Sequence, residues 1–156
     1  MTRVRTRRWV WLGVGAAVPA LLLVALPAVY FVTVHGCGEA EHRLARTMAG
    51  EAVLAVAPAR GAERVDTYEG CDDDDLFVWA GRTYRYGGPA EAALRRCREA
   101  AEADGWRQRT VAAGDPVSGC LGKELGGTTA YLTVGEMDGG LLDVSITADR
   151  QGSEWC

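Results

Sequence analysis

The longest pattern in the chain is an apolar run. Residues 9–34 are 26 consecutive positions without a charged side chain. An α-helix rises about 1.5 Å per residue, so such a run spans roughly 39 Å, whereas the hydrocarbon core of a bilayer is about 30 Å thick. Pro19 and Pro27 would each remove one helical hydrogen bond, which a kinked helix tolerates. The run therefore predicts one transmembrane helix over residues 9–34.

Two later segments carry the spacing of amphipathic helices. In residues 39–56, apolar side chains recur every four positions, at Ala40, Leu44, Met48, Ala52 and Val56. In residues 89–104, a second apolar face consists of Ala90, Ala93, Leu94, Cys97 and Ala101. Gly50 weakens the first helix and Pro58 ends it, while Gly105 supplies a left-handed cap for the second. One face of each helix is expected to pack on a sheet.

Short segments between these helices have the composition of β-strands. Residues 65–68, 76–79 and 82–86 are rich in aromatic and β-branched side chains. The Ala80-Gly81 dipeptide separates the last two segments, and it indicates a two-residue hairpin turn.

The C-terminal third has the pattern of an antiparallel meander. Residues 106–111 form a return strand after the second helix. Strands 120–125 and 128–134 flank Gly126-Gly127, a two-residue hairpin turn. Residues 142–147 alternate strictly between apolar and polar side chains, as a half-buried strand does.

The order of these elements predicts an α+β fold, in which an N-terminal transmembrane helix is followed by a small antiparallel sheet with helices packed on one face. Residues 1–8 are then the cytoplasmic basic segment, and residues 9–34 are the membrane helix. Residues 35–64 form a membrane-proximal helix and connector. Residues 65–156 form the extracytoplasmic α+β domain.

The distribution of charged residues predicts how the chain is oriented across the membrane. Arginine occupies four of the first eight positions, and basic residues favour the cytoplasmic side of a membrane helix. We therefore expect a single-pass protein of the cytoplasmic membrane, with its N-terminus inside and its C-terminus outside. Of 17 basic and 21 acidic residues, only those four arginines precede the run, which leaves the outer part a net charge of −8 with histidine neutral. An acidic domain argues against nucleic acid as a partner.

A cysteine lies close to the end of the run. Val34-His35-Gly36-Cys37 resembles the lipobox at which bacterial lipoproteins are acylated on cysteine, although the histidine departs from that pattern. Lipidation at Cys37 is therefore an alternative to an uncleaved membrane helix, and cleavage as an ordinary signal peptide is another. All three arrangements place the residues from Cys37 onward outside the cytoplasm.

Four further cysteines lie in the outer part, at Cys71, Cys97, Cys120 and Cys156. In an oxidising compartment, the cysteines of a small domain are usually paired. We expect Cys71–Cys120 to join two strand ends and Cys97–Cys156 to tie the tail to a helix. A free, buried Cys97 is the main competing arrangement. A metal site is not expected, because there is no Cys-x-x-Cys pair and no histidine cluster.

Residue types that catalysis often needs are scarce. His35 and His42 are the only histidines, and none follows in the rest of the chain. The lack of histidine after residue 42 excludes Ser-His-Asp and Cys-His nucleophiles and histidine-ligated zinc from the globular part. We therefore expect no enzymatic activity, no catalytic residues and no cofactor.

Two groups of side chains could bind a ligand. Asp72, Asp73, Asp74 and Asp75 are a weak calcium candidate, because carboxylates suit Ca²⁺ but the spacing of an EF-hand loop is missing. Consecutive residues of an extended chain point to opposite faces, so this run is expected to form a solvated acidic turn. The second group is aromatic and is expected mainly in the core. Its members are Phe77, Trp79, Tyr84, Tyr86, Trp106 and Tyr131.

The chain combines a basic N-terminus, an apolar run and a boundary cysteine with an acidic domain that contains Cys-Asp-Asp-Asp-Asp at 71–75 and Gly-Thr-Thr-Ala-Tyr-Leu at 127–132. This combination resembles the small membrane-anchored or lipoprotein-like hypothetical proteins of actinobacteria. The resemblance implies a location in the cell envelope and no particular activity.

The expected function is therefore the display of a small non-enzymatic interaction or binding domain by a single-pass membrane protein. The alternative is a lipoprotein anchored at Cys37 with a small ligand- or ion-binding domain. The membrane is the expected partner through residues 9–34, and another envelope protein is a candidate partner.

Overall fold

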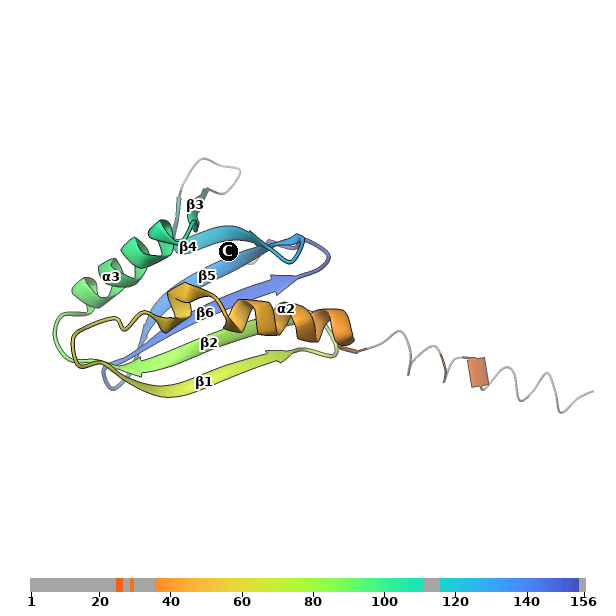
Figure 1. Ribbon diagram of the computed structural model, residues 1–156, viewed down its shortest axis with the longest axis horizontal. Coiled ribbons are helices and arrows are strands. Elements are labelled where there is room, and N and C mark those ends of the chain that lie inside the picture. The colour runs from red at the N-terminus through yellow and green to blue at the C-terminus, as the bar shows by residue number, and fades with distance from the viewer. Residues whose placement is uncertain (1–24, 27–28, 30–35, 111–115, 155–156) are drawn as a thin grey trace, which may run out of the picture. The chain divides into compact units, whose positions relative to one another are not determined.

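Figure 1 shows the protein as a computed structural model. The structure describes residues 25–26, 29, 36–110 and 116–154. The chain divides into two compact units, residues 1–36 and residues 37–156, and the second unit contains the sheet and the helices that cover it.

The predicted transmembrane segment lies almost entirely outside the described residues. Within it, Ala25, Leu26 and Val29 are described, and all three are helical. No helix in the described part of the chain has both the length and the apolar character that a membrane span requires. The span over residues 9–34 therefore stays a prediction.

The described part of the second unit contains two α-helices, one short 3₁₀ helix and six strands. In chain order they are α2 (Glu39–Ala49), η1 (Ala52–Ala55), β1 (Glu63–Cys71), β2 (Phe77–Arg85), α3 (Ala90–Ala103), β3 (Arg107–Thr110), β4 (Pro116–Leu125), β5 (Thr128–Met137) and β6 (Leu141–Asp149). The helix predicted over residues 89–104 is confirmed as α3, and Gly105 follows it with the expected positive φ, 93°.

The six strands form one antiparallel sheet in the order β1-β2-β6-β5-β4-β3 (Figure 1). The predicted meander is confirmed, because β4, β5 and β6 are consecutive neighbours joined by tight turns. β6 comes last along the chain yet lies inside the sheet, paired with β2 on one side and with β5 on the other. The domain thus has the expected α+β architecture.

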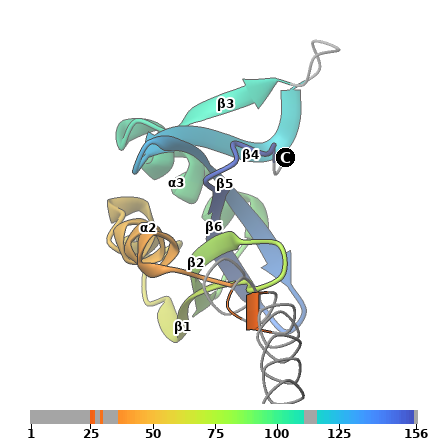
Figure 2. The same cartoon turned by 90° about the vertical axis from the view of Figure 1, so that its right-hand side faces the viewer.

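Both helices lie on the same side of the sheet, as the edge-on view in Figure 2 shows. We name the side under α2, η1 and α3 the covered face. Its strand residues are Val78, Ala80, Tyr84, Leu121, Leu125, Ala130, Leu132, Leu142, Val144, Ile146 and Ala148. The opposite side is the open face, and its residues include Tyr68, Gly70, Phe77, Trp79, Gly81, Thr83, Tyr131, Thr133, Gly135, Asp143, Ser145 and Thr147.

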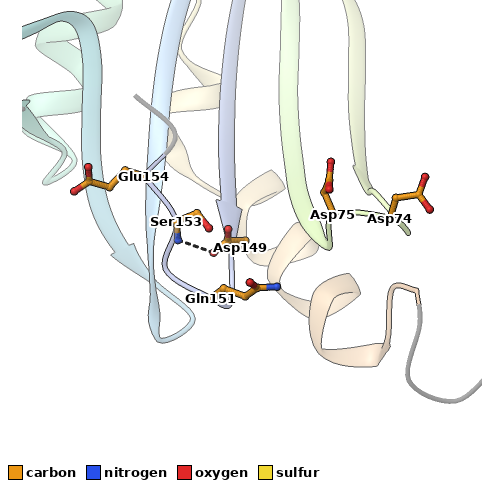
Figure 3. A pocket seen from close by; sticks show the side chains of 6 residues that line it. All are labelled: Asp74, Asp75, Asp149, Gln151, Ser153 and Glu154. Carbon is orange, nitrogen blue, oxygen red and sulfur yellow. Dashed lines mark hydrogen bonds between the residues drawn. The ribbon is translucent and has the colours of Figure 1, made fainter. Parts of the chain in front are cut away.

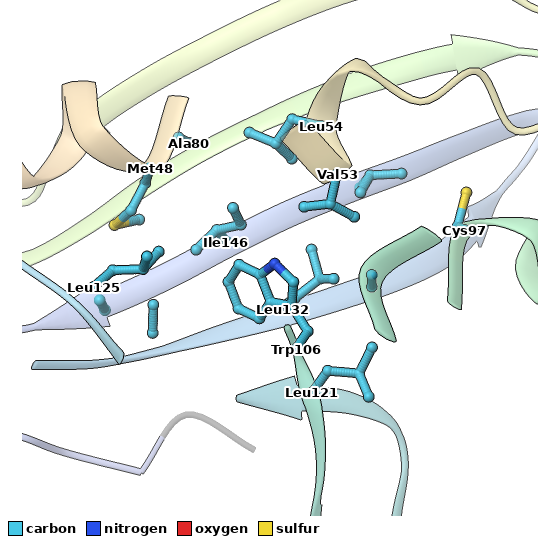
Figure 4. Close-up of a cluster of buried hydrophobic side chains, with 14 of the residues drawn as sticks. Met48, Val53, Leu54, Ala80, Cys97, Trp106, Leu121, Leu125, Leu132 and Ile146 are labelled. Atoms are coloured by element: carbon cyan, nitrogen blue, oxygen red, sulfur yellow. The ribbon is translucent and has the colours of Figure 1, made fainter. Parts of the chain in front are cut away.

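A single hydrophobic core fills the space between the covered face and the helices (Figure 4). Met48 of α2 and Trp106, just after α3, are both fully buried in this core, as are Leu132 and Ile146 of the sheet. Each such side chain contributes about 1.5–3 kcal/mol when it leaves water. Packing of α2 and α3 on the sheet is therefore the main source of the domain's stability.

The single lysine of the chain fixes both helices to one strand. Nζ of Lys123 on β4 lies 2.6 Å from Oε2 of Glu51, which follows α2, and 3.2 Å from Oδ2 of Asp104, which follows α3. Burial lowers the pKa of Lys123, but the hydrogen bonds and charges of Glu51 and Asp104 outweigh that effect and raise it. Lys123 therefore stays charged and holds the ends of both helices at β4.

The hairpin predicted at Ala80-Gly81 is wrong, because β2 runs through both residues without a turn. Ala80 is fully buried and pairs with Ile146 on β6. Gly81 lies beneath the ring of Tyr68, which comes from β1. A glycine inside a strand can allow the close approach of a side chain, and that is its role here.

The helix predicted over residues 39–56 is shorter than expected. It ends at Ala49, and the backbone N–H of Gly50 closes the last turn by bonding to the carbonyl oxygens of Arg46 and Thr47. The chain then continues as the 3₁₀ helix η1, which buries Val53 and Leu54. The predicted apolar period holds at Leu44 and Met48 within α2, but it fails beyond Gly50, where Ala52 is exposed.

Candidate functional site

The aspartate run lies at the corner between β1 and β2. Oδ1 of Asp72 accepts hydrogen bonds from the backbone N–H groups of Asp74 and Asp75, both at 2.9 Å. Oδ1 of Asp73 accepts one from the backbone N–H of Cys37 at 2.8 Å. The run therefore forms the expected acidic turn, in which two of the four carboxylates hold the loop together.

A hollow of about 360 Å³ lies beside this corner (Figure 3). Its lining residues are Asp74, Asp75, Asp149, Gln151, Ser153 and Glu154. Figure 3 shows the first two on the strand corner and the others on the chain that ends and follows β6. Asp149 is buried, and its Oδ1 already accepts the backbone N–H of Ser153 at 2.9 Å.

The carboxylates of this hollow do not form a metal-binding group. In the described part of the chain, no group of three Asp, Glu, His or Cys side chains is placed to hold a metal. The calcium candidate is thereby reduced to Asp74 and Asp75, whose side chains are exposed. Two exposed carboxylates supply far fewer oxygens than the six to eight that Ca²⁺ takes.

A polar cluster crosses the open face of the sheet. Tyr68 on β1 donates its phenolic hydrogen to the carboxylate of Asp143 on β6, with oxygen distances of 2.8 and 2.9 Å. Thr83, on the strand between them, also donates to Oδ1 of Asp143, at 3.1 Å. Burial and the neighbouring Asp143 carboxylate raise the pKa of Tyr68, so the phenol keeps its proton at neutral pH. Side chains from three strands therefore meet at one carboxylate.

Aromatic rings on the open face lie over glycines of the neighbouring strand. A Cβ atom at Gly70 would come within 2.7 Å of the Trp79 ring, and one at Gly81 would collide with the Tyr68 ring. Phe77 extends this aromatic region, with its ring centroid 5.2 Å from that of Trp79. Trp79 and Tyr68 are half-buried, so part of each ring remains accessible from solvent.

The six aromatic candidates do not form one ligand surface. Tyr84 and Trp106 belong to the core, as expected for most of the set. Tyr131 is also buried, but on the open face. Tyr86 follows β2 and donates to Oε1 of Glu136 at 3.0 Å. The accessible aromatic region consists of the open-face side chains described above.

The disulfide predicted between Cys71 and Cys120 is wrong, because Cys71 pairs with Cys37. Cys71 ends the edge strand β1, whereas Cys120 lies on β4, with three strands between them. Neighbouring strands are about 4.8 Å apart, so the four spacings from β1 to β4 amount to about 19 Å across the sheet. A disulfide needs about 4.4–6.8 Å, and the Cα atoms of Cys37 and Cys71 are 6.1 Å apart.

The predicted Cys97–Cys156 pair is also wrong, because Cys97 is a free cysteine. It packs on the inner side of α3 with 2% of its surface exposed. Burial raises the pKa of its thiol to about 11. Cys120 is disulfide-bonded, and Cys156 lies outside the described residues.

The polar cluster around Asp143 was missed by sequence reasoning. Tyr68 and Asp143 are 75 residues apart, and each resembles an ordinary polar position of a strand. Only the pairing of β1 and β6 with β2 brings them together. The glycines at 70 and 81 were the available signal, since each lies within a strand where a side chain would be expected.

Comparisons with protein-family models, with curated proteins and with solved structures find no match to this chain. The resemblance to actinobacterial envelope proteins therefore stays a prediction.

Proposed function

We propose that the chain is a single-pass protein of the cytoplasmic membrane, with its N-terminus inside, which displays a small non-enzymatic binding domain outside. The alternative is a lipoprotein that is acylated on Cys37 and displays the same domain. In both cases the domain acts by binding another component of the envelope.

The observation that carries this proposal is the disulfide between Cys37 and Cys71. Disulfides persist in oxidising compartments and are rare in the cytoplasm. Cys37 is the third residue after the apolar run, so the bond begins where a chain that crosses the membrane would emerge. The disulfide and the run therefore support the same outer location for the domain.

Two described residues within the run support a lipid environment. Leu26 and Val29 are helical, and 63% and 57% of their surfaces are exposed. Exposed apolar surface costs about 25 cal/mol per Å² in water, whereas the acyl chains of a bilayer solvate it. A helix with such residues on its surface is stable in a membrane.

The open face supports binding rather than catalysis. Accessible parts of Tyr68 and Trp79 lie beside the hydroxyl groups of Thr133, Ser145 and Thr147. Aromatic side chains are enriched where proteins recognise partners, because they bury a large area at little cost in conformational entropy. No histidine follows residue 42, so the nucleophile systems that use histidine are missing from this part of the chain.

The topology is tested by fusing a reporter enzyme, one that folds only after oxidation outside the cytoplasm, to the C-terminus. We expect the fusion to be active. A matched variant with Arg3, Arg5, Arg7 and Arg8 changed to glutamate should lose this activity, because the charge bias that sets the orientation is removed. Activity only of a reporter that folds in the cytoplasm would refute the proposal.

The anchor and lipoprotein alternatives are separated by the mass of the mature protein. An uncleaved anchor retains residues 1–36, whereas a lipoprotein begins at an acylated Cys37. The lipid would occupy the same sulfur that forms the disulfide with Cys71. An acylated Cys37 would therefore establish the alternative and would also show that this disulfide is absent from the mature protein.

A further inference from the structure

We propose that residues 36–38 form a hinge at the start of the domain and that the Cys37–Cys71 disulfide locks it in a redox-dependent way. Its biological setting, an oxidising compartment outside the membrane, rests on the proposed function. The hinge itself rests on contacts within the described residues.

The first observation is the sequence Gly36-Cys37-Gly38, in which the bonded cysteine lies between two glycines. Gly36 has a φ of 98°, a conformation that other residues rarely adopt. Gly38 is the N-cap of α2, and its extended backbone turns the chain into the helix. Glycines on both sides would let the backbone rotate freely if the central residue were released.

The second observation is that two bonds from one corner hold the central residue. Cys71 supplies the disulfide, and Oδ1 of Asp73 accepts the backbone N–H of Cys37 at 2.8 Å. The corner is itself fixed, because Asp72 binds the backbone N–H groups of the two aspartates that follow Asp73. Asp72 and Asp73 of the aspartate run therefore hold the hinge residue Cys37 in place.

The third observation is that the core does not depend on this lock. α2 is held to the sheet by Leu44, Ala45 and Met48, which are buried and lie more than one helical turn beyond Gly38. Cys37 and Cys71 are only half-buried. A break at the disulfide should therefore release the first turn of α2 and the hinge while the rest of the helix stays packed.

The chemical step is ordinary thiol–disulfide exchange with a dithiol reductant. A thiolate of the dithiol attacks one sulfur of the Cys37–Cys71 bond and forms a mixed disulfide, releasing the other cysteine as a thiolate that takes up a proton. The second thiol of the reductant then displaces the remaining cysteine. The reductant is oxidised to its own disulfide, and the protein gains two thiols. Cys97 takes no part, because it is buried inside the core.

The test compares amide hydrogen exchange in the full chain, solubilised in detergent, with and without this disulfide. In a Cys37→Ser/Cys71→Ser variant we expect exchange to become about tenfold faster or more in residues 36–43 and 71–77. Residues 128–134 and 141–148, in the central strands, should be unchanged. A Cys97→Ala variant is the matched cysteine control, and dithiothreitol added to the unmodified chain should produce the same acceleration in residues 36–43 and 71–77.

Two outcomes would overturn the hinge. Unchanged exchange in residues 36–43 would mean that the disulfide locks nothing. Faster exchange throughout the sheet would mean that the disulfide stabilises the whole domain and does not act on a local hinge. Failure of the reporter fusion would withdraw the outer location but would not affect these exchange rates, so the two proposals fail separately.

Discussion

The two faces of the sheet differ in chemistry, although the same strands build both. On the covered face, Leu132 of β5 and Ile146 of β6 are completely buried beneath the helices. Thr133, which follows Leu132, and Ser145, which precedes Ile146, lie on the open face. Their hydroxyl groups share a hydrogen bond of 3.0 Å. Stability is concentrated on the covered face, so side-chain changes on the open face cost the fold less, which suits the proposed binding role.

The open face nevertheless has a defined structure. Its rings lie over glycines, and its central carboxylate, Asp143, accepts hydrogen bonds from Tyr68 and Thr83. These contacts fix side chains that solvent can partly reach. A pre-ordered surface loses less conformational entropy when a partner binds.

The largest expected effect is on the covered face. Leu132→Ala should lower the free energy of unfolding by about 2–5 kcal/mol, because it leaves a cavity in the core. Its neighbour on the other face is the matched control: Thr133→Ala should cost at most about 1 kcal/mol, the value of one hydrogen bond. Urea unfolding followed by tryptophan fluorescence measures both. Equal losses would show that the two faces do not divide stability in this way.

A glycine provides the next test. Gly81→Ala should cost about 1–3 kcal/mol, because the new methyl group displaces the Tyr68 ring and its bond to Asp143. Gly135, also on the open face, has free space where a Cβ would lie. Gly135→Ala should therefore be neutral or slightly stabilising. A Gly81→Ala/Tyr68→Ala double variant should lose less than the two single losses added together.

A smaller effect should appear at high pH. The pKa of Tyr68 is higher in the folded chain than in the unfolded chain, because burial and Asp143 disfavour the phenolate. The stabilisation is therefore complete below about pH 10, the ordinary tyrosine pKa, and is lost as pH rises through the folded-state value. The stability difference between the unmodified chain and Tyr68→Phe should be about 0.5–1.5 kcal/mol at neutral pH and should shrink above pH 10. A constant difference across this range would contradict the assignment.

The smallest expected effect is that of calcium on the acidic corner. Millimolar calcium should leave the melting temperature unchanged, because Asp72 and Asp73 already bind backbone N–H groups. A ligand present at about 100 times its dissociation constant would add about 2.7 kcal/mol of stability. A rise of several degrees that a chelator reverses would show that the corner does bind the ion. Asp74→Asn/Asp75→Asn would then identify the two exposed carboxylates as ligands if it abolished that rise.

Local spacing predicted much of the fold. The period of about four in α3 and the glycine after it were both readable from the sequence. So was the alternation of β6, because one side of that strand packs under the helices and the other does not. Gly126 and Gly127 marked the turn between β4 and β5, where both have positive φ angles. Each of these features depends on residues that are neighbours along the chain.

Such local patterns could not predict the order of the strands in the sheet, and the cysteine pairing follows from that order. Alternation shows that a residue faces one side of a sheet, but it does not show which strand lies beside it. The pairing of Cys71 with Cys120 fails because β1 lies at an edge of the sheet, with three strands between it and β4. The straight course of β2 through Gly81 likewise requires Tyr68 of the neighbouring strand to be in place.

The sequence by itself determined the apolar run, the charge asymmetry around it, the helix and strand periods and the absence of histidine after residue 42. The tertiary structure decided which cysteines pair and which polar residues meet at Asp143. The physical reason is that helix and strand periods arise from backbone geometry within a few residues. A contact between residues 75 positions apart forms only when burial of the whole core offsets the entropy of closing the chain between them.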